Sequence, residues 1–521
     1  MVNSFVKSSF LVEGAMAKYR PYDYSQRVMI PISLEDQLMP GTLEFAIHTL
    51  VEDRMDLSVF ENRYDNDETG RWAYDPKVLL KVVLFAYSRG LISSRKMERA
   101  CRENITFMAL TCGQCPDHST IAAFVSSMRN EILPLFRDVL LVCEESHLLE
   151  GTLFALDGSK VPSNASKEWS GKISDLKRKK KKIEKQVKAL LRQQVEVDQR
   201  GEEEGKAGEG ESLLDRTKQI ARLRKNAKRI GKFLKEHGVR LGRNGKEVKS
   251  NVTDNESATM MTSHGTVQGY NGQALVDSKH QVIVHAEAFG EGQDHHHIAP
   301  MVDGAKENME ALGHGEGYFE GKRLAADSNY HSPPNLNKCE EERLDAYIPD
   351  TDFRKRDPRF ATQKRHRPKK TERFGLEDFQ HDEATDKYIC PQGKALKVRA
   401  KEAVMRGVIY KRYAADKNDC KVCELRLRCI RGQNGKRKYL SVPLRRIPGS
   451  LTQAMVEKID TEQGRDIYNK RIGIVEPVFA NIRFQKRLDR FWLRGKTKVN
   501  IQWLLYCMVH NIGKIMRYSF A

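Results

Sequence analysis

The sequence predicts an α/β protein with an N-terminal helical domain, a core that contains strands, a helical-hairpin insertion and a strand-rich insertion. Three observations favour this fold class. Apolar residues recur at helical spacing from Asp75 to about Leu149. Short strand-like runs lead to Asp157 and Asp327. A charged segment at 172–238 repeats apolar residues at heptad-like spacing, as paired helices do.

Composition supports a large protein with a polyanionic partner. The chain has 521 residues, 39% of them hydrophobic, which is enough for several domains with buried cores. Lys and Arg number 90 against 70 Asp and Glu, a net charge of +20. This excess favours nucleic acid as partner, although ribosome-associated and membrane-surface proteins are also basic. No secretion signal and no run of roughly 20 apolar residues is found, so we expect a cytosolic protein.

Residues 1–149 are predicted to form the helical domain. The run "KVLLKVVLFAYSRG" predicts a helix that stops at Gly90, and "SSRKMERACREN" begins with serine caps. A third helix begins near "PDHSTIAAF", where Asp117 or Ser119 can accept a first-turn amide hydrogen bond. Short helices joined by tight turns fit a helix-turn-helix-like DNA-binding domain. A helical bundle used for dimerisation fits equally well.

Residues 150–171 and 239–337 are expected to form the first part of the core. The run "GTLFALDGSKV" predicts a short strand that ends at Asp157 and is followed by a glycine turn. Two more strands are expected around the turn at Asp277 to His280, and a further strand leads to Asp327. Open sheets with parallel strands bind ligands beyond strand ends. Both acids are therefore expected at such an edge.

Two insertions and a C-terminal helical part complete the prediction. Segment 172–238 fits two antiparallel helices joined by "RGEEEGKAGEGE", and "KRKKKK" at Lys177 to Lys182 forms either a solvated face or a contact with DNA phosphates. Segment 338–446 is strand-rich and basic, with "FRKRDPRFATQKRHRPKK" as an exposed loop. Residues 447–521 return to helix. The apolar positions expected to join the two helices are Leu176, Ile183, Val187, Leu190 and Gln194, with Ile220, Leu223, Ala227, Ile230 and Leu234.

One carboxylate in "RIGIVEPVFANIRFQKR" is surrounded by apolar and basic residues. Glu476 lies next to an apolar stripe at helical spacing and is expected to be half covered, while Pro477 predicts a kink or a restart of the helix. Three carboxylates from two strands and a helix would be hard oxygen ligands for Mg²⁺ or Mn²⁺. Two such ions catalyse in-line phosphoryl displacement. The stripe consists of Ile472, Val475, Phe479 and Ile482.

Three blocks of this sequence resemble the active-site blocks of DDE transposases from bacterial insertion sequences, in the branch called eleven-eighty-two within the wider groups four and five. The blocks are "LFALDGSKVPSNAS", "RLAADSNYHSPPNL" and "YNKRIGIVEPVFANIRFQKR". The upstream runs "RPYDYSQRVMIPISL", "DPKVLLKVVLFAYSRGLISSRKMERACREN" and "PDHSTIAAF" are similar to the N-terminal domain of that family. The resemblance thus covers nearly the whole chain.

The resemblance implies an RNase H-like catalytic core in which Asp157, Asp327 and Glu476 are catalytic and hold two Mg²⁺ or Mn²⁺ ions. Tyr468, Arg471 and Arg483 match the family signature and are expected to bind DNA. Four residues separate Arg471 from Glu476, where the best-known signature has three, and the last position is Arg rather than Lys. The shifted Arg471 either contacts DNA or pairs with an acid.

The function implied is a DNA transposase that cleaves the ends of an insertion sequence and joins the 3′ ends to target DNA. Its partners would be double-stranded DNA, as terminal inverted repeats and target, and a second copy in a homodimer on DNA, with no membrane. Lys179 and Lys181 are further candidate DNA contacts. The expected location is the bacterial cytoplasm, at the nucleoid. Two alternatives remain: a metal-dependent nuclease of the same fold without strand transfer, and a catalytically silent DNA-binding protein.

A second metal site is suggested by Cys390, Cys420, Cys423 and Cys429. Their spacing ends in C-x2-C-x5-C, and four thiolates could close a structural zinc site. Unligated reduced thiols are the alternative. The "TCGQC" pair at Cys112 and Cys115 lacks nearby partners and is expected to be plain thiols.

Three further features have ordinary structural explanations. The run Asp294 to His297 tempts a metal interpretation, but consecutive side chains diverge, so a turn or helix cap is expected. Asp254 and Glu256 are expected to be capping acids rather than support for a metal site. Trp492 is expected to make ordinary packing contacts rather than to stack on a flipped base.

Overall fold

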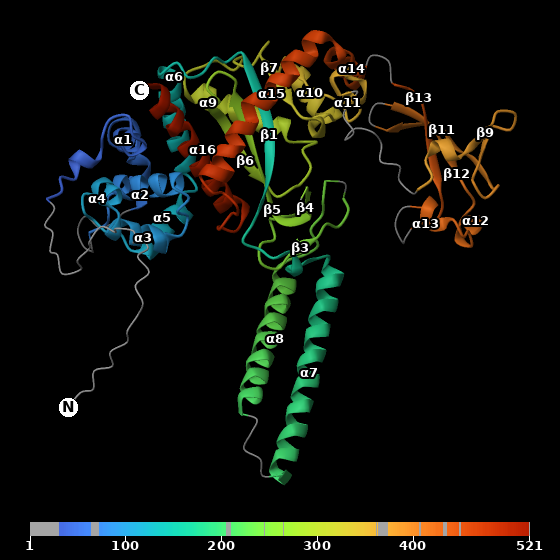
Figure 1. The fold of residues 1–521 in the computed structure, drawn as a ribbon, viewed down its shortest axis with the longest axis horizontal. Helices are drawn as coiled ribbons and strands as arrows, with labels where there is room; N and C mark the ends of the chain where they lie inside the picture. Colours follow the sequence, from blue (N-terminus) through green and yellow to red (C-terminus); the bar gives the residue numbers. More distant parts are fainter. Residues whose placement is uncertain are drawn as a thin grey trace, which may run out of the picture.

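The computed structural model describes residues 31–63, 72–204, 210–243, 245–263, 265–360, 362, 373–405, 408–430, 435–446 and 450–519. Figure 1 shows a central sheet with helices on it, an N-terminal group of helices at one side, a long helical hairpin that projects from the sheet, and a small separate sheet at the other side. The mixture of helices and mixed sheets confirms the α/β class. Part of the N-terminal run quoted above, 20–30, lies outside the described residues.

The N-terminal helices form as the sequence predicts. Asp117 caps the third predicted helix by accepting hydrogen bonds from the amides of Ser119 and Thr120, whereas Ser93 precedes its helix without a capping bond. Gly90 follows the first predicted helix with φ +70°, which is unfavourable for other residues. The helices are α1 (Leu43–Thr49), α2 (Pro76–Ser88), α3 (Ser94–Glu103), α4 (Ile105–Leu110), α5 (His118–Ser127) and α6 (Ile132–Glu145).

One hydrophobic core joins these helices to the sheet. α2 is buried on nearly all sides because it packs within the helical group and also against α16 (Lys496–Ser519). α16 contacts α6 and the strand β6 (Ile283–Phe289) as well, and its residues Val499 to Ile512 are almost entirely buried. The long C-terminal helix therefore attaches the N-terminal helices firmly to the sheet.

The central sheet has six strands and mixed direction. β1 (Leu153–Pro162) lies between β5 (Gly265–Asp277), to which it is antiparallel, and β7 (Arg323–Ala326), to which it is parallel. β8 (Asp345–Tyr347) continues the sheet parallel to β7. β4 (Ala258–Thr262) and β6 pair with successive parts of the free edge of β5. The strands expected around Asp277 to His280 and before Asp327 are thus confirmed.

The prediction that a strand ends at Asp157 is wrong, because β1 continues to Pro162. Gly158 is not a turn residue but lies opposite Gln273 in the ladder with β5. A Cβ atom at Gly158 would lie 2.1 Å from the side-chain amide of Gln273 and 2.7 Å from Asn271. Glycine is therefore required by close packing of polar side chains, and not by backbone bending.

The C-terminal part contains α14 (Leu451–Asp460) and α15 (Glu462–Ala480), which packs against β1 and β7. α15 runs through Pro477 without the predicted restart. Proline cannot donate a hydrogen bond to the carbonyl oxygen of Gly473, one turn earlier. The side chain of Gln281 donates to that oxygen instead, at 3.0 Å. This substitute bond removes much of the cost of proline inside the helix.

The two helices predicted at 172–238 are α7 (Ile173–Glu204) and α8 (Gly210–Glu236). They pack along an apolar seam in which most of the predicted positions are buried and Phe233 also takes part. At the base, Trp169 lies against the cations of Lys179 and Arg229, at 4.8 and 5.3 Å from the ring centre. The linker residues 205–209 and the side chain of Gln194 lie outside the described residues.

A separate antiparallel sheet follows the first part of the core. Its core among the described residues is small, with five buried apolar side chains. β8 lies within the range 338–446 that the sequence assigns to this region, yet it pairs with β7 of the central sheet. The strands are β9 (Gln380–Asp382), β10 (Lys387–Ile389), β11 (Ala395–Met405), β12 (Val408–Ala414) and β13 (Tyr439–Arg446).

The exposed loop predicted at 353–370 begins instead with a short helix, α11 (Phe353–Arg356). The ring of Phe353 is buried against Tyr468 of α15, with centroids 5.4 Å apart, and this packing makes the prediction wrong for the first residues. Residues 361 and 363–370 lie outside the described part.

The expected turn and the expected cap at Glu256 are present, whereas the cap predicted at Asp254 is wrong, because its carboxylate accepts a tyrosine hydroxyl instead. Asp294 to His297 form a turn that leads into α9 (Ile298–Ala311). Glu256 accepts the amide of Lys496 at the start of α16, at 2.7 Å, and Asp254 accepts the Tyr270 hydroxyl at 2.8 Å. Among the helices of the described residues, none combines the length and the apolar character needed to cross a bilayer.

Gly158→Ala should lower the free energy of unfolding by about 1–3 kcal/mol, because the new methyl group has no space beside the fixed amides of β5. Gly513→Ala in α16 is the matched control, since nothing lies within 4 Å of its added Cβ and alanine favours helix. Urea denaturation of the two variants measures the difference. Equal stability of both would contradict the packing role of Gly158.

Candidate active site

A surface cleft lies between β1 and α15. It has a volume of about 680 Å³ and is lined by side chains from both elements. Asp157 and Ser159 belong to β1, and because they are two residues apart they point to the same face of the sheet. Glu476 on α15 and Arg483, just beyond it in the π-helical turn Asn481–Gln485, complete the polar lining. The structure therefore brings together residues that are more than 300 positions apart.

Asp157 is the most constrained acid of the cleft. One carboxylate oxygen accepts the amide of Gly158 at 2.8 Å, and the other accepts Nη1 of Arg471 at 2.8 Å. Burial raises the pKa of Asp157 from its usual 3.8 to about 6; Arg471 opposes this rise, and repulsion from Asp327 adds to it. The carboxylate is therefore costly to ionise in this surrounding.

Asp327 directly follows β7, as predicted. Because Ala326 pairs with Leu156 in the parallel ladder, Asp327 and Asp157 occupy adjacent positions of neighbouring strands. Asp327 accepts the amide of Asn329 at 2.8 Å. Burial raises its pKa, while the Asn329 hydrogen bond and Arg471 oppose the rise. The two aspartates thus share one electrostatic environment.

Glu476 is exposed, so the prediction of a half-covered carboxylate is wrong. The buried face of α15 includes Arg471, Ile474, Val475 and Val478. Val475 and Ile482 of the predicted stripe are buried as expected, whereas Ile472 is 43% exposed, so the helix is turned slightly from the expected orientation. Glu476 consequently points into the cleft with access to solvent and to any ligand there.

Arg471 and Tyr468 are both buried on α15, and DNA contact by these two residues stays a prediction. Of the two alternatives left open for Arg471, the structure has the ion pair with an acid, Asp157. Its guanidinium also lies 5.7 Å from the ring centre of Tyr468. Tyr468 is therefore placed to support Arg471, and Arg471 to hold Asp157.

Arg483 reaches the floor of the cleft, where its Nη1 donates to Ser159 at 3.2 Å. Phe484 beside it lines the cleft and is 80% exposed. Trp492 is 49% exposed, so it packs on one side only. The cause is that Phe491, its neighbour, takes the buried position against Trp503 and Tyr270.

The three acids are not grouped as a ready-made metal site. In the part of the chain that the structure describes, no three His, Cys, Asp or Glu side chains are arranged so that they could hold a metal ion. Asp157 and Glu476 both line the cleft. Asp157 is close enough to Asp327 for the two carboxylates to repel one another, and Arg471 donates a hydrogen bond to Oδ2 of Asp157. The guanidinium supplies part of the positive charge that these acids need.

A buried polar network behind Asp157 was not predicted. Gln273 and Asn271 alternate along β5 and both donate to Asp294, at 2.8 and 2.6 Å. The Tyr330 hydroxyl donates to Gln273. Asn271 and Gln273 stand two residues apart in an otherwise largely apolar strand, and this pattern could have predicted a buried polar contact. This network lies on the face of the sheet opposite Asp157. The side chains of Gln273 and Asn271 pack directly against Gly158 of β1, where a larger residue would have no space.

The two candidate lysines of the hairpin differ in their surroundings. Lys179 is half covered, donates to the carbonyl oxygen of Glu168 and lies over Trp169. Lys181 is exposed and lines a groove between α7 and α8. Lys179 therefore anchors the base of the hairpin, and Lys181 faces solvent.

The four cysteines of the predicted zinc site line one cavity of about 370 Å³ at an end of the small sheet. Cys390 accepts the amide of Lys394 at 3.3 Å, as cysteine sulfur does in tight turns. All ten cysteines are free thiols, and among the described residues these four are not arranged so that they could hold a metal ion. Four-thiolate zinc binding stays a prediction, since ligation would require the thiols to turn toward one another.

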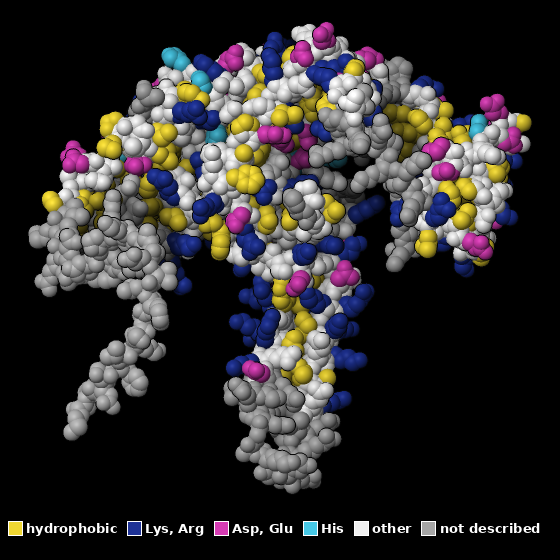
Figure 2. Space-filling model, viewed as in Figure 1, with side chains coloured by type: hydrophobic (Ala, Val, Ile, Leu, Met, Phe, Trp, Pro, Cys, Tyr) yellow, Lys and Arg dark blue, Asp and Glu magenta, His cyan; other side chains and the backbone are white. Residues whose placement is uncertain are grey.

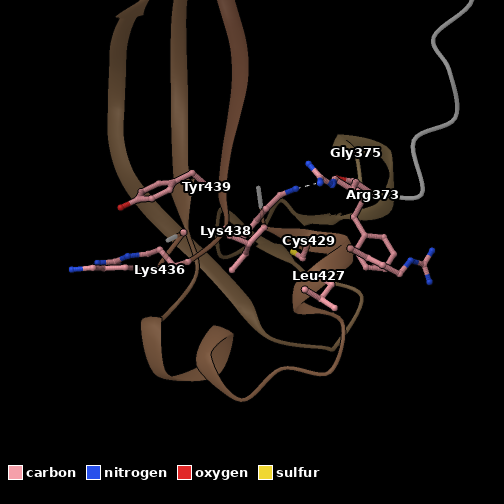
Figure 3. Close-up of a pocket in the computed structure, with 12 residues that line it drawn as sticks. Arg373, Gly375, Leu427, Cys429, Lys436, Lys438 and Tyr439 are labelled. Carbon is pink, nitrogen blue, oxygen red and sulfur yellow. Dashed lines mark hydrogen bonds between the residues drawn. The ribbon is translucent and has the colours of Figure 1, made fainter. Parts of the chain in front are cut away.

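A second cavity adjoins the cysteines and is strongly basic. It has a volume of about 1050 Å³, and its lining includes Arg373, Lys436 and Lys438 together with Cys429 and Tyr439 (Figure 3). Lys438 lines this cavity, and its amino group donates a hydrogen bond to the carbonyl oxygen of Phe374 at 2.9 Å. This lysine therefore fastens the segment at 374 to β13.

The raised pKa of Asp157 predicts a pH dependence of stability in the metal-free protein. Between about pH 4 and about pH 6 the folded chain retains a proton on Asp157 that the unfolded chain has lost, so rising pH favours unfolding in this window. The unfolding free energy of the wild type minus that of Asp157→Asn should fall across this window and then level. Urea denaturation in the presence of a chelator measures it; a difference that is constant with pH would contradict the shift.

Comparison with protein families gives two matches. Residues 389–516 match the family described as "Transposase DDE domain", and residues 32–127 match the family described as "Transposase domain (DUF772)". The first match includes Arg471, Glu476 and Arg483. It begins after Asp157 and Asp327 and therefore does not include either aspartate. No curated protein and no solved structure matches the chain. The two family matches together indicate a transposase and support a DDE transposase family for this chain.

Proposed function

We propose that this protein is a DNA transposase of the eleven-eighty-two branch, which binds the ends of an insertion sequence, cleaves phosphodiester bonds there and joins the 3′ ends to target DNA. The observation in support is the cleft in which Asp157 and Glu476 lie beside Arg483, with Asp327 next to Asp157 in the parallel strands. Two copies, one at each end of the element, would form the homodimer on double-stranded DNA.

The sheet topology supports an RNase H-like catalytic core. β6, β5 and β1 are antiparallel neighbours, β7 and β8 follow parallel to β1, and α15 packs on β1 and β7. The hairpin of α7 and α8 leaves the sheet after β1, and the small sheet follows β8. Both additions leave the order of the core strands unchanged, as insertions must.

The donors of the cleft suit Mg²⁺ or Mn²⁺. Asp157 and Glu476 in the cleft and Asp327 on the strand beside Asp157 offer carboxylate oxygens, the ligands such ions prefer, and these side chains would have to turn toward a common ion to bind it. The raised pKa values of both aspartates indicate that Arg471 alone does not balance their charge, so a further cation would be favourable. Two bound divalent ions would activate a water or hydroxyl oxygen and stabilise the leaving oxygen of the phosphodiester.

The side chains of the chain itself position the DNA. Arg471 orients Asp157, and its burial among apolar neighbours keeps that orientation fixed. Arg483 uses one nitrogen on Ser159, and the rest of its guanidinium is free to hold a phosphate by parallel hydrogen bonds. Ile472 and Phe484 present apolar surface at the cleft to a sugar or a base.

The decisive experiment incubates the protein with Mg²⁺ and DNA that carries the inverted repeats flanking the element. We expect cuts at the element ends and joined products in target DNA. Asp157→Asn and Glu476→Gln should each bind the DNA but lower cleavage by more than about 100-fold, because each removes a metal ligand. Mapping of cut and joined ends checks both parts.

Other outcomes would replace the proposal. Cleavage without joined products would assign the protein as a nuclease of the same fold. Binding of the repeats without any cleavage, in Mg²⁺ and in Mn²⁺, would assign it as a catalytically silent DNA-binding protein.

Arg483→Ala should weaken DNA binding in the cleft by about tenfold, since a charge-assisted hydrogen bond to phosphate is lost. Arg483→Lys should recover only part of the affinity, because lysine keeps the charge but not the planar fork. Arg490→Ala is the matched control, as Arg490 is exposed and outside the cleft lining. Equal effects of Arg483→Ala and Arg490→Ala would contradict a specific role of Arg483.

A further inference from the structure

The hairpin of α7 and α8 carries a groove in which more than half of the lining residues are cationic. Eight Lys or Arg side chains line it against one acid, Glu184. Figure 2 shows Lys and Arg side chains along both edges of the projecting hairpin, with an apolar line between them. The cations are Lys180, Lys181, Lys185 and Lys188 from α7 with Arg224, Lys228, Lys232 and Lys235 from α8.

Charge of one sign at this density is unfavourable without a partner. Exposed helices usually alternate charges so that side chains four residues apart attract one another. In this groove Lys180 pairs with Glu184 at 3.4 Å and Lys232 with Glu236 at 3.7 Å. Lys181, Lys185, Lys228 and Lys235 are exposed and have no ion pair with another described residue. Their mutual repulsion would be relieved by a polyanion.

The groove is better suited to a polyanion than to an apolar helix. Of the three apolar side chains that line the groove, Val187 and Ala227 are only 7% exposed because they already pack between the two helices, and Leu191 is half-buried. A third helix would find little apolar surface to bury. The exposed part of the groove is the rows of ammonium and guanidinium groups, which bind phosphate.

The charge along the groove is comparable with that of duplex DNA. The cations span eight residue steps on α7, Lys180 to Lys188, and eleven on α8, Arg224 to Lys235, so the longer row covers about 16 Å of helix axis. Duplex DNA carries one negative charge per roughly 1.7 Å, so about nine charges occupy the same length. Eight cations therefore approach the charge density of the duplex.

We propose that the groove between α7 and α8 holds the sugar-phosphate backbone of double-stranded DNA, without base recognition, outside the catalytic cleft. The inference rests on the proposed function only in taking DNA as the polyanion. The hairpin leaves the sheet directly after β1, the strand that carries Asp157, and its base is fixed by Trp169 between Lys179 and Arg229. A rigid arm in this position would hold DNA that extends from the cleft.

The test compares two full-length variants of equal net charge. The groove variant carries Lys181→Gln, Lys185→Gln, Lys228→Gln and Lys235→Gln. The control variant carries Lys177→Gln, Lys182→Gln, Arg222→Gln and Lys225→Gln, four exposed cations of the same helices outside the groove lining. Circular dichroism and thermal melting check that both fold. Binding to a labelled duplex of about 30 base pairs and arbitrary sequence is measured at several salt concentrations.

We expect the groove variant to bind the duplex about tenfold or more weakly, with a salt slope shallower by up to about 3.6, because each lost phosphate contact contributes about 0.9. The control variant should remain near the wild type in both. Equal losses in the two variants would show that only net charge matters, and no loss in either would leave the groove without this role. A preference of the wild type for single-stranded DNA that the groove variant abolishes would overturn the duplex assignment.

A cleavage assay separates this inference from the proposed function. If the wild type binds the duplex through the groove but never cleaves repeat DNA, the groove assignment stands and the transposase proposal fails. If the wild type cleaves and the groove variant binds as the wild type does, the groove assignment fails and the transposase proposal stands.

Discussion

The ion pair between Arg471 and Asp157 is the interaction on which the site depends. It joins α15 to the central strand β1 in a place where both side chains are largely shielded from water. A buried pair is costly to form, yet removing one partner leaves an uncompensated charge, so the two elements are held at one relative position. That position sets Glu476 and Arg483 over the same cleft as Asp157. Without it, α15 would be an ordinary helix on a sheet.

The opposite face of β1 is fixed by polar contacts rather than by charge. Asp294 accepts bonds from two amide side chains of β5, and this cluster fills the space that Gly158 leaves. The guanidinium of Arg471 thus holds the Asp157 carboxylate on one face of the sheet, and the polar cluster packed against Gly158 holds β1 on the other face. Such pre-organisation is what a site that binds charged groups requires, because its own acids repel one another.

The hairpin and the small sheet show how a core can carry additions at low cost. Each has its own apolar cluster, so neither takes residues from the main core. Most of the described seam is buried, and the two helices hold two rows of cations that a loop could not keep in register. The small sheet has few buried residues, and its basic cavity and four thiols gather at one end.

The sequence by itself determined the local helices and strands and the residues that are able to take part in the chemistry of the site. Periodicity located α2, α5, α7, α8 and α15, and the cap at Asp117 was readable because capping depends on neighbours in the chain. Only the tertiary structure decided the continuation of β1 past Gly158, the exposure of Glu476 and the partner of Arg471. Each depends on groups distant in sequence: the amides of Gln273 and Asn271, the rotation of α15 on the sheet, and Asp157. Local pattern carries no information on such contacts, because they arise only when separate elements pack together.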